Sequence, residues 1–254
     1  MLEYNSIFIT GASSGIGAAL ALSYAKPSVA LWLCGRDLVR LSSVAEACRA
    51  QGAAVETKQI DVAVQADMER WIEACDAQAA LDLVIANAGV SLGPTARSIE
   101  DREKFNDLLS VNIVGVLNTV YPALDVMSKR RHGQIALVSS LSGYLGMPTA
   151  PAYSASKNFV KSWGTAIAPH AKAQGVSVSV ICPGFVKSGI TDKNKFPMPL
   201  LITAEKAAKI ITRGLRKREL IITFPFPLRL IVWLISIMPA WLANKLMEGL
   251  PKKN

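Results

Sequence analysis

The stretch Thr10-Gly11-Ala12-Ser13-Ser14-Gly15-Ile16-Gly17 directly follows an apolar run, residues 6–10, that is typical of a buried strand. Glycines at such a position allow a tight turn and let the backbone approach a ligand closely. If a helix begins near Gly15, its free N–H groups offer a site to a phosphate. The pattern therefore predicts a nucleotide-binding turn between a first strand and a first helix. An ordinary tight turn is the alternative, because glycine spacing alone is weak evidence.

Apolar runs alternate with helix-like stretches along the next two-thirds of the chain. Further strands are expected at residues 29–34, 54–60, 81–86, 133–139 and 176–182, and helices at residues 15–25, 37–51, 66–77, 101–129 and 153–174. Strands that are apolar throughout are typical of a parallel sheet with helices on both faces. With right-handed crossovers, this alternation predicts an α/β fold with a doubly wound parallel sheet of the Rossmann type.

The basic character of the chain is local. Of the formal net charge of +9, residues 204–254 contribute +7, with 10 Lys/Arg and 3 Asp/Glu. A local excess of this kind indicates an anionic surface such as a membrane. Because no zinc-finger pattern and no Lys/Arg stripe with interleaved aromatic residues occurs, we expect no nucleic-acid partner.

Cysteine and histidine usage predicts no metal site. The four cysteines form no CxxC pair, and the two histidines lack metal-ligand spacing to a partner. Buried thiols in a reducing compartment are expected instead. No basic region precedes the first apolar run, so we expect no secretory signal and a cytoplasmic location, either free or on the cytoplasmic face of a membrane.

Tyr153 and Lys157 are four residues apart, which places them on one face of a helix. A free tyrosine has a pKa of about 10, and a neighbouring ammonium lowers it by stabilising the phenolate. Such a tyrosine can exchange a proton with a carbonyl oxygen. A surface Tyr–Lys pair without function has the same spacing, so the pair alone does not decide between these readings.

Two more polar residues are candidates for the same site. Ser140 ends the fifth expected strand, where ligands bind in open α/β sheets, and its hydroxyl can stabilise charge on a substrate oxygen. On composition alone, Ser139 and Ser142 compete for this role. Asn112 interrupts an apolar helix, and a buried amide there needs hydrogen-bond partners.

Together these motifs resemble the short-chain dehydrogenase/reductase family. The resemblance spans residues 6 to about 190 and rests on the GxxxGxG turn, Asn87-Ala88-Gly89, Asn112, Ser140, Tyr153-Ser154-Ala155-Ser156-Lys157 and Pro183-Gly184. The family carries a second Asn where this chain has Ala86. The family's spacing to the tyrosine selects Ser140 among the three serines.

The resemblance implies hydride transfer between NADP(H) and a carbonyl or hydroxyl group. Tyr153 would be the acid/base, Lys157 its tuner and a ribose contact, Ser140 the carbonyl clamp, and Asn112 the holder of a water linked to the lysine. Cofactor contacts are expected from Gly11, Ser13, Ser14, Gly15, Ile16, Gly17, Arg36, Asp61, Val62, Asn87, Ala88, Gly89, Tyr153, Lys157, Pro183, Gly184, Val186 and Ser188. The family also pairs subunits through the helices that carry Asn112 and Tyr153, so a homodimer or homotetramer is expected.

The end of the second strand favours NADP over NAD. NAD-binding sheets carry an acidic residue there, but this chain has Gly35 followed by Arg36. An arginine can pair with a ribose 2′-phosphate by charge-assisted hydrogen bonds. A register shift of one residue would instead bring Asp37 to the ribose.

The C-terminal fifth is unusually apolar. Arg229 is the one charge between Glu219 and Lys245, and residues 230–238 are apolar nearly all round. Such a helix is buried in protein or lipid. Arg229 and Pro239 fit a full membrane span poorly, whereas flanking basic residues and two tryptophans favour contact of residues 220–245 with a membrane surface. Burial against a partner subunit, or as a substrate lid, is the alternative.

We expect residues 1–202 to form the dinucleotide-binding and catalytic region. Residues 203–254 should continue the same single domain as a short helical appendage, beginning with a helix over residues 203–218 that Thr203 caps. The apolar segments 185–201 and 144–148 would wall the substrate site, which favours an apolar ketone or its alcohol.

Two other functions stay open at this point. One is a catalytically idle NADP-binding protein with a regulatory or scaffold role at a membrane surface. The other is a sugar-nucleotide epimerase or dehydratase on a related fold. The complete set of catalytic candidates argues against the first, and the glycine spacing and absence of a longer substrate domain argue against the second.

Overall fold

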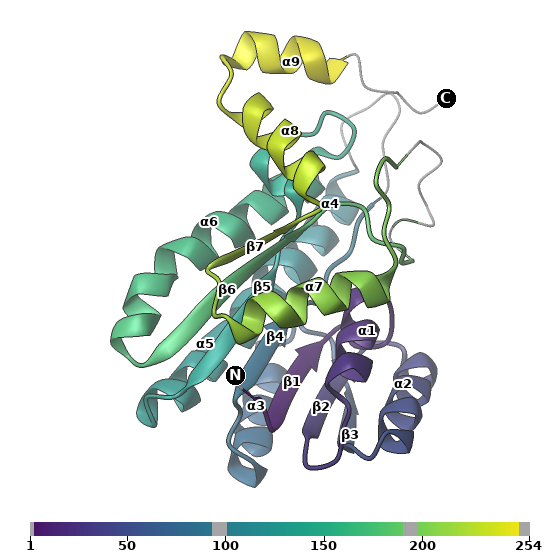
Figure 1. Ribbon diagram of the computed structural model, residues 1–254, viewed down its shortest axis with the longest axis vertical. Helices are drawn as coiled ribbons and strands as arrows, with labels where there is room; N and C mark the ends of the chain where they lie inside the picture. The colour runs from purple at the N-terminus through teal and green to yellow at the C-terminus, as the bar shows by residue number, and fades with distance from the viewer. Residues whose placement is uncertain (1–2, 93–100, 190, 192–197, 249–254) are drawn as a thin grey trace.

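The computed structural model describes residues 3–92, 101–189, 191 and 198–248. Within these residues, seven strands form one parallel sheet in the order β3-β2-β1-β4-β5-β6-β7 (Figure 1). The strands are β1 (Ser6–Thr10), β2 (Ala30–Gly35), β3 (Ala54–Gln59), β4 (Leu83–Ala86), β5 (Gly133–Val138), β6 (Val176–Pro183) and β7 (Ile221–Phe224). The strand order reverses between β1 and β4, where ligands bind in sheets of this kind.

Helices cover both faces of the sheet, which confirms the predicted doubly wound fold (Figure 1). One face carries α1 (Gly15–Tyr24), α2 (Leu38–Ala50) and α7 (Ala204–Arg216), and the other carries α3 (Gln65–Gln78), α5 (Gly115–Lys129) and α6 (Pro151–Ala173). The remaining helical elements are α4 (Arg102–Leu109), the π-turn η1 (Ser110–Val114), the short η2 (Leu141–Tyr144), α8 (Phe226–Ser236) and α9 (Ala240–Glu248).

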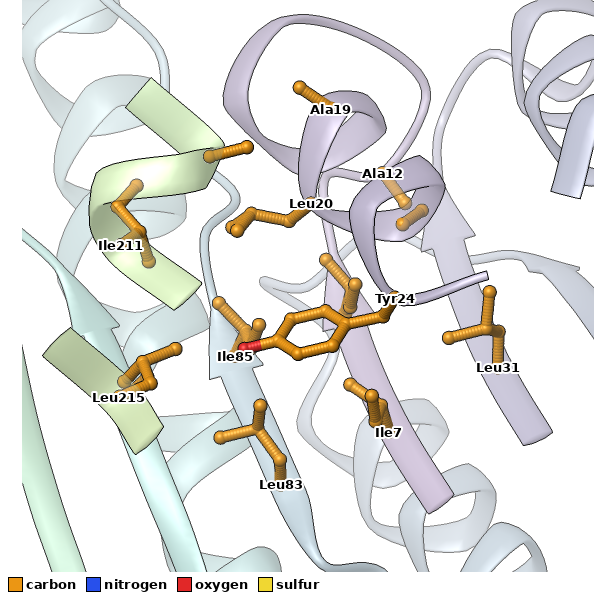
Figure 2. Close-up of a cluster of buried hydrophobic side chains, with 14 of the residues drawn as sticks. Ile7, Ala12, Ala19, Leu20, Tyr24, Leu31, Leu83, Ile85, Ile211 and Leu215 are labelled. Carbon is orange, nitrogen blue, oxygen red and sulfur yellow. The ribbon is translucent and has the colours of Figure 1, made fainter. Parts of the chain in front are cut away.

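Alternate side chains of the central strands fill two separate cores. Ile7 and Ile9 of β1 are fully buried in the core beneath α1 and α7, whereas Phe8 between them is fully buried in the opposite core. Figure 2 shows the first core, in which Leu20 of α1 and Ile211 of α7 lie over the sheet. Burial of each such side chain contributes about 1.5–3 kcal/mol, which explains why these strands are apolar throughout.

The helical stretch from residue 102 to 129 is long and apolar enough to cross a membrane by length and composition. Within it, Val116, Val120 and Ala123 are buried in the core shared with the sheet. This packing identifies the stretch as a core helix of the domain.

The strand β7 was not predicted from the sequence, and the assignment of its residues to the candidate membrane segment 220–245 is wrong. Ile221–Phe224 pairs with β6, and Ile222 and Phe224 are buried. The strand has four residues and continues directly into the apolar α8, so no change of hydrophobic period marks it. The preceding helix was predicted correctly, and the Thr203 side chain accepts a hydrogen bond from the Lys206 N–H.

Neighbouring isoleucines of β7 provide a test of this packing. Ile222 is 3% exposed and packs against α7 at Gly214, whereas Ile221 is 41% exposed. We expect Ile222→Ala to lower the free energy of unfolding by about 2–5 kcal/mol and Ile221→Ala by less than about 1 kcal/mol, as measured by urea denaturation. Equal effects of the two substitutions would contradict the assignment of β7 to the sheet.

Candidate active site

A cavity of about 1220 Å³ lies at the carboxyl ends of the central strands. Its wall includes these predicted site residues: Gly11, Ser13, Ser14, Gly15, Ile16, Arg36, Asp61, Val62, Asn87, Ala88, Gly89, Ser140, Tyr153, Lys157, Pro183, Gly184, Val186 and Ser188. Asn112 and Gly17 do not contribute to the wall and lie behind it. The structure therefore gathers residues spread over 178 positions of sequence, from 11 to 188, around one space.

The glycine turn is held against the loop that follows β4. Gly11 has a φ of +62°, and a Cβ on it would lie 2.8 Å from the Ala88 Cα. Gly17 is needed for packing rather than for the wall, since its Cβ would lie 2.4 Å from the Gly11 carbonyl oxygen. The Asn87 amide donates hydrogen bonds to the carbonyl oxygens of Thr10 (2.9 Å) and Gly11 (3.1 Å). Side chains at these glycines would separate the two loops.

Thr10 completes this junction and was not singled out from the sequence. Its buried hydroxyl oxygen accepts hydrogen bonds from the backbone N–H groups of Asn87 and Ala88, both at 3.0 Å. The one sequence feature that could have identified Thr10 is its polar side chain at the end of an apolar strand. Its partners, 77 and 78 residues away, could not be read from local sequence.

Two arginines and one aspartate lie at the cavity end beside β2. Arg36, Asp37 and Arg40 all line the wall. The Asp37 carboxylate caps α2, and it accepts hydrogen bonds from the Arg40 backbone N–H (3.0 Å) and from Arg40 Nε (2.7 Å). These bonds hold the Asp37 pKa below its ordinary value, the backbone bond most strongly. Arg40 is a second cation that was not predicted from the sequence, although it lies in the first turn of α2, four residues after Arg36.

Tyr153 and Lys157 meet near the middle of the cavity, both from α6. Lys157 is buried, its Nζ lies 5.7 Å from the centroid of the Tyr153 ring, and it donates a hydrogen bond to the Val138 carbonyl (2.9 Å). Burial lowers the pKa of Lys157 to about 8, because the ammonium loses hydration. The predicted helical pairing of the two side chains is therefore present.

The pKa of Tyr153 shifts in the direction opposite to the one expected from sequence. Burial raises it, and a hydrogen bond from Ser140 opposes that effect in part. The expectation from sequence included the neighbouring ammonium, which lowers the pKa of the phenol, but not the loss of solvent around the phenol, which raises it. At neutral pH the phenol is therefore protonated, and the site presents a proton donor.

The structure separates Ser140 from its competitor Ser139. Ser139 also lines the cavity, but its hydroxyl is engaged, since it donates to the Lys157 carbonyl oxygen at 2.6 Å. The Ser140 oxygen accepts from the Ser142 N–H at 3.1 Å and lies beside the Tyr153 phenol. Ser142 also lines the cavity.

Asn112 is buried behind the cavity wall and does not line the cavity. Its amide bonds to both the N–H (2.8 Å) and the carbonyl (3.0 Å) of Val90, and it donates to the Ser156 hydroxyl at 3.1 Å. It lies in the π-turn η1, and such turns are frequent at functional sites. A Cβ on Gly89 would lie 3.1 Å from Lys157 Nζ and 3.3 Å from Asn112 Oδ1, so the two polar groups share one small space.

The end of the cavity beyond Tyr153 is apolar. Three segments supply its lining: Leu141, Leu145 and Met147; Phe185, Val186 and Pro199; and Leu228, Ile231, Val232 and Ile235 of α8. The first two contain residues of the predicted walls 144–148 and 185–201, of which residues 190 and 192–197 lie outside the described part of the chain. The α8 contribution corresponds to the lid alternative for the C-terminal segment.

The cysteines are all buried and free, as expected. In the described ranges, no group of three or more His, Cys, Asp or Glu side chains is arranged to hold a metal ion.

Comparisons with known proteins agree with this architecture. Residues 5–197 match the family model for short chain dehydrogenase. An uncharacterized oxidoreductase of Myxococcus xanthus is 36% identical over 240 residues, which cover 94% of each chain. A Sphingobium yanoikuyae short-chain dehydrogenase in complex with NADPH has a TM-score of 0.80 at 23% identity and covers 98% of this chain and 97% of its own.

A Burkholderia phymatum short chain dehydrogenase/reductase in complex with NAD has a TM-score of 0.85, also at 23% identity, and covers 100% of this chain and 99% of its own. These two structures share the fold, and the family match and the Myxococcus relative establish kinship. The chain therefore belongs to the short-chain dehydrogenase/reductase family of oxidoreductases.

Proposed function

We propose that this protein reduces the carbonyl group of an apolar ketone with NADPH, and reverses the reaction when the alcohol is in excess. One observation carries the proposal: a single cavity joins the arginines beside β2, the hydroxyls of Ser140 and Tyr153, and an apolar wall. A cavity of about 1220 Å³ exceeds the usual range for one small ligand, so it has room for a dinucleotide and a substrate.

The residues present fit a dinucleotide. Gly11 and the N-terminus of α1 leave backbone N–H groups near the space where a pyrophosphate would bind. Asp61 and Val62 would contact the adenine, Lys157 the ribose, and Ser188 the nicotinamide amide. When bound there, NADPH supplies the hydride. The other expected contacts are Ser13, Ser14, Gly15, Ile16, Gly17, Asn87, Ala88, Gly89, Pro183, Gly184 and Val186.

Four side chains perform the proton chemistry. The hydroxyls of Ser140 and Tyr153 hydrogen-bond the carbonyl oxygen and hold it for reaction. Because burial keeps the Tyr153 phenol protonated, it donates its proton to that oxygen as negative charge develops there. The Lys157 ammonium stabilises the resulting phenolate, and Asn112 positions the groups through which solvent restores the proton.

The preference for NADPH rests on the charges at the end of β2. Asp37 is committed to Arg40 and to the α2 cap, so its carboxylate is not free to accept ribose hydroxyls as an NAD-specific acid does. Arg36 and Arg40 are both at the cavity wall and can pair with the 2′-phosphate. One similar structure contains NADPH and the other contains NAD, so the comparison does not indicate which cofactor this chain prefers. The proposed preference therefore rests on the residues of this chain.

A partly exposed aromatic cluster supports a homodimer or homotetramer. Tyr121 of α5 is 55% exposed and contacts Trp163 of α6 edge to face, and Phe159 stacks on Trp163. A partner subunit would cover these rings at the helices predicted to pair. Within each subunit, residues 203–254 would continue the catalytic domain that residues 1–202 begin, since β7 pairs with β6. A cytoplasmic location completes the proposal.

Tyr153→Phe removes the proton donor and keeps the ring. We expect kcat for reduction of a bulky apolar ketone to fall at least about 100-fold, while NADPH binding measured by fluorescence stays within about twofold. Tyr121→Phe is the matched control and should retain full activity. Unchanged turnover in Tyr153→Phe would favour the idle scaffold alternative.

Arg36→Ala and Arg40→Ala should each weaken NADPH binding about tenfold or more, because each removes a charge-assisted contact to the 2′-phosphate. NADH, which lacks that phosphate, should bind no more weakly than to the unaltered protein, since Arg40→Ala also releases the Asp37 carboxylate. Arg49→Ala, on the far end of α2, serves as control because Arg49 bonds to the Val55 carbonyl and not to the cavity. Equal losses for both cofactors would refute this assignment.

The pKa of Lys157, about 8, predicts a pH limb in the free enzyme. Its ammonium is present below that pH and lost above it, so kcat/KM for NADPH should be level below pH about 8 and fall about tenfold per unit above it. Tyr153 does not cause this limb, since its pKa is raised. Lys157→Met should have low activity without the limb. A wild-type profile that stays level to pH about 9.5 would contradict the role of the ammonium.

A further inference from the structure

Helix α8 has apolar side chains on two opposite faces. Leu228, Val232 and Ile235 form an inner stripe that lines the cavity. Leu230, Trp233, Leu234 and Ile237, at the positions between, are 45%, 50%, 42% and 62% exposed. No residue of α8 is fully buried. The inner stripe is explained by the substrate site, and the outer stripe is not explained by anything within the chain.

The neighbouring helix α9 also exposes large apolar side chains. Phe226 at the start of α8 and Trp241 on α9 are each 70% exposed, and Leu246 is 48% exposed. Figure 1 shows α8 and α9 at one end of the molecule, beyond the edge of the sheet. Several large exposed apolar side chains on neighbouring helices mark an interaction site. We call the outer stripe of α8 together with Trp241 and Leu246 the docking face.

The charges around the docking face select its partner. Between Leu220 and Met247 the chain has two charged residues, Arg229 and Lys245, and both are basic and exposed. Two tryptophans with nearby basic residues suit the boundary between anionic headgroups and acyl chains. On α8 and α9 together, these two basic residues outnumber one acidic residue, Glu248 at the end of α9. With 11 residues, α8 is too short for a span, which needs about 20.

We propose that the docking face binds the surface of an anionic lipid bilayer, and that the cavity takes ketones dissolved in that bilayer. Ile231 connects the two, because it lines the cavity and is also 52% exposed. It therefore lies at the rim between the substrate site and the docking face. The substrate class in this inference rests on the proposed carbonyl reduction, whereas the lipid binding does not.

Vesicle flotation of the full chain tests the lipid binding. The wild type should float with phosphatidylcholine vesicles that contain phosphatidylglycerol, and less with pure phosphatidylcholine. Leu230→Gln/Trp233→Gln should lower the partition coefficient at least about tenfold, since two large apolar groups leave the bilayer. Val232→Ala, on the inner stripe of the same helix, should float like the wild type. Thermal melting and NADPH binding establish that each variant is folded.

A paired activity assay tests the substrate route. For the Leu230→Gln/Trp233→Gln variant, kcat/KM should fall at least about tenfold for a long-chain ketone presented in vesicles and stay unchanged for a small water-soluble ketone. If the wild type reduces neither ketone, the carbonyl reduction fails while the flotation result stands by itself.

Three outcomes would overturn the inference. The first is a wild type that does not float with either vesicle, and the second is a double variant that floats undiminished. The third is a concentration-dependent dimer, seen by light scattering, that the double substitution dissolves without any change in flotation, since a second copy would then cover the docking face.

Discussion

The whole site depends on one hydrogen-bonded junction between the ends of β1 and β4. Thr10 and Asn87 each bond to the opposite loop, and Gly11 and Gly17 let the two backbones approach. The strand order reverses between β1 and β4, so the connections that follow these two strands run to opposite sides. A space is left between them at the carboxyl ends of the strands. The junction thereby aligns the glycine turn with Gly89, beside which Lys157 and Asn112 lie.

Burial is the second organising effect, and it acts on the two key ionisable groups in opposite directions. It raises the pKa of Tyr153 and lowers that of Lys157 to about 8, since each charged form loses solvation. The order of the two pKa values is therefore reversed relative to the free side chains, with that of Tyr153 now the higher. A proton donor suited to carbonyl reduction results. The Ser140 hydrogen bond moderates the phenol and also marks where the substrate oxygen would lie.

The C-terminal segment joins substrate and surroundings through one short helix. β7 secures the segment to the sheet, and α8 then crosses the open end of the cavity. Its inner stripe lines the cavity that also contains Ser140 and Tyr153. Its outer stripe is exposed and is the surface proposed to bind a lipid bilayer. In the proposed function, α8 therefore contributes both to substrate choice and to location.

The sequence by itself determined the doubly wound fold, the glycine turn and the helical pairing of Tyr153 with Lys157, because each depends on short-range periodicity or spacing. Nearly all of the site residues predicted through motif resemblance lie in the cavity wall. Only the tertiary structure decided that Ile221–Phe224 joins the sheet, that Asp37 is engaged by Arg40 and that Ser139 points to the Lys157 carbonyl. It also decided the direction of the Tyr153 pKa and the two faces of α8. These features depend on burial and on partners brought together by folding, which local sequence does not encode.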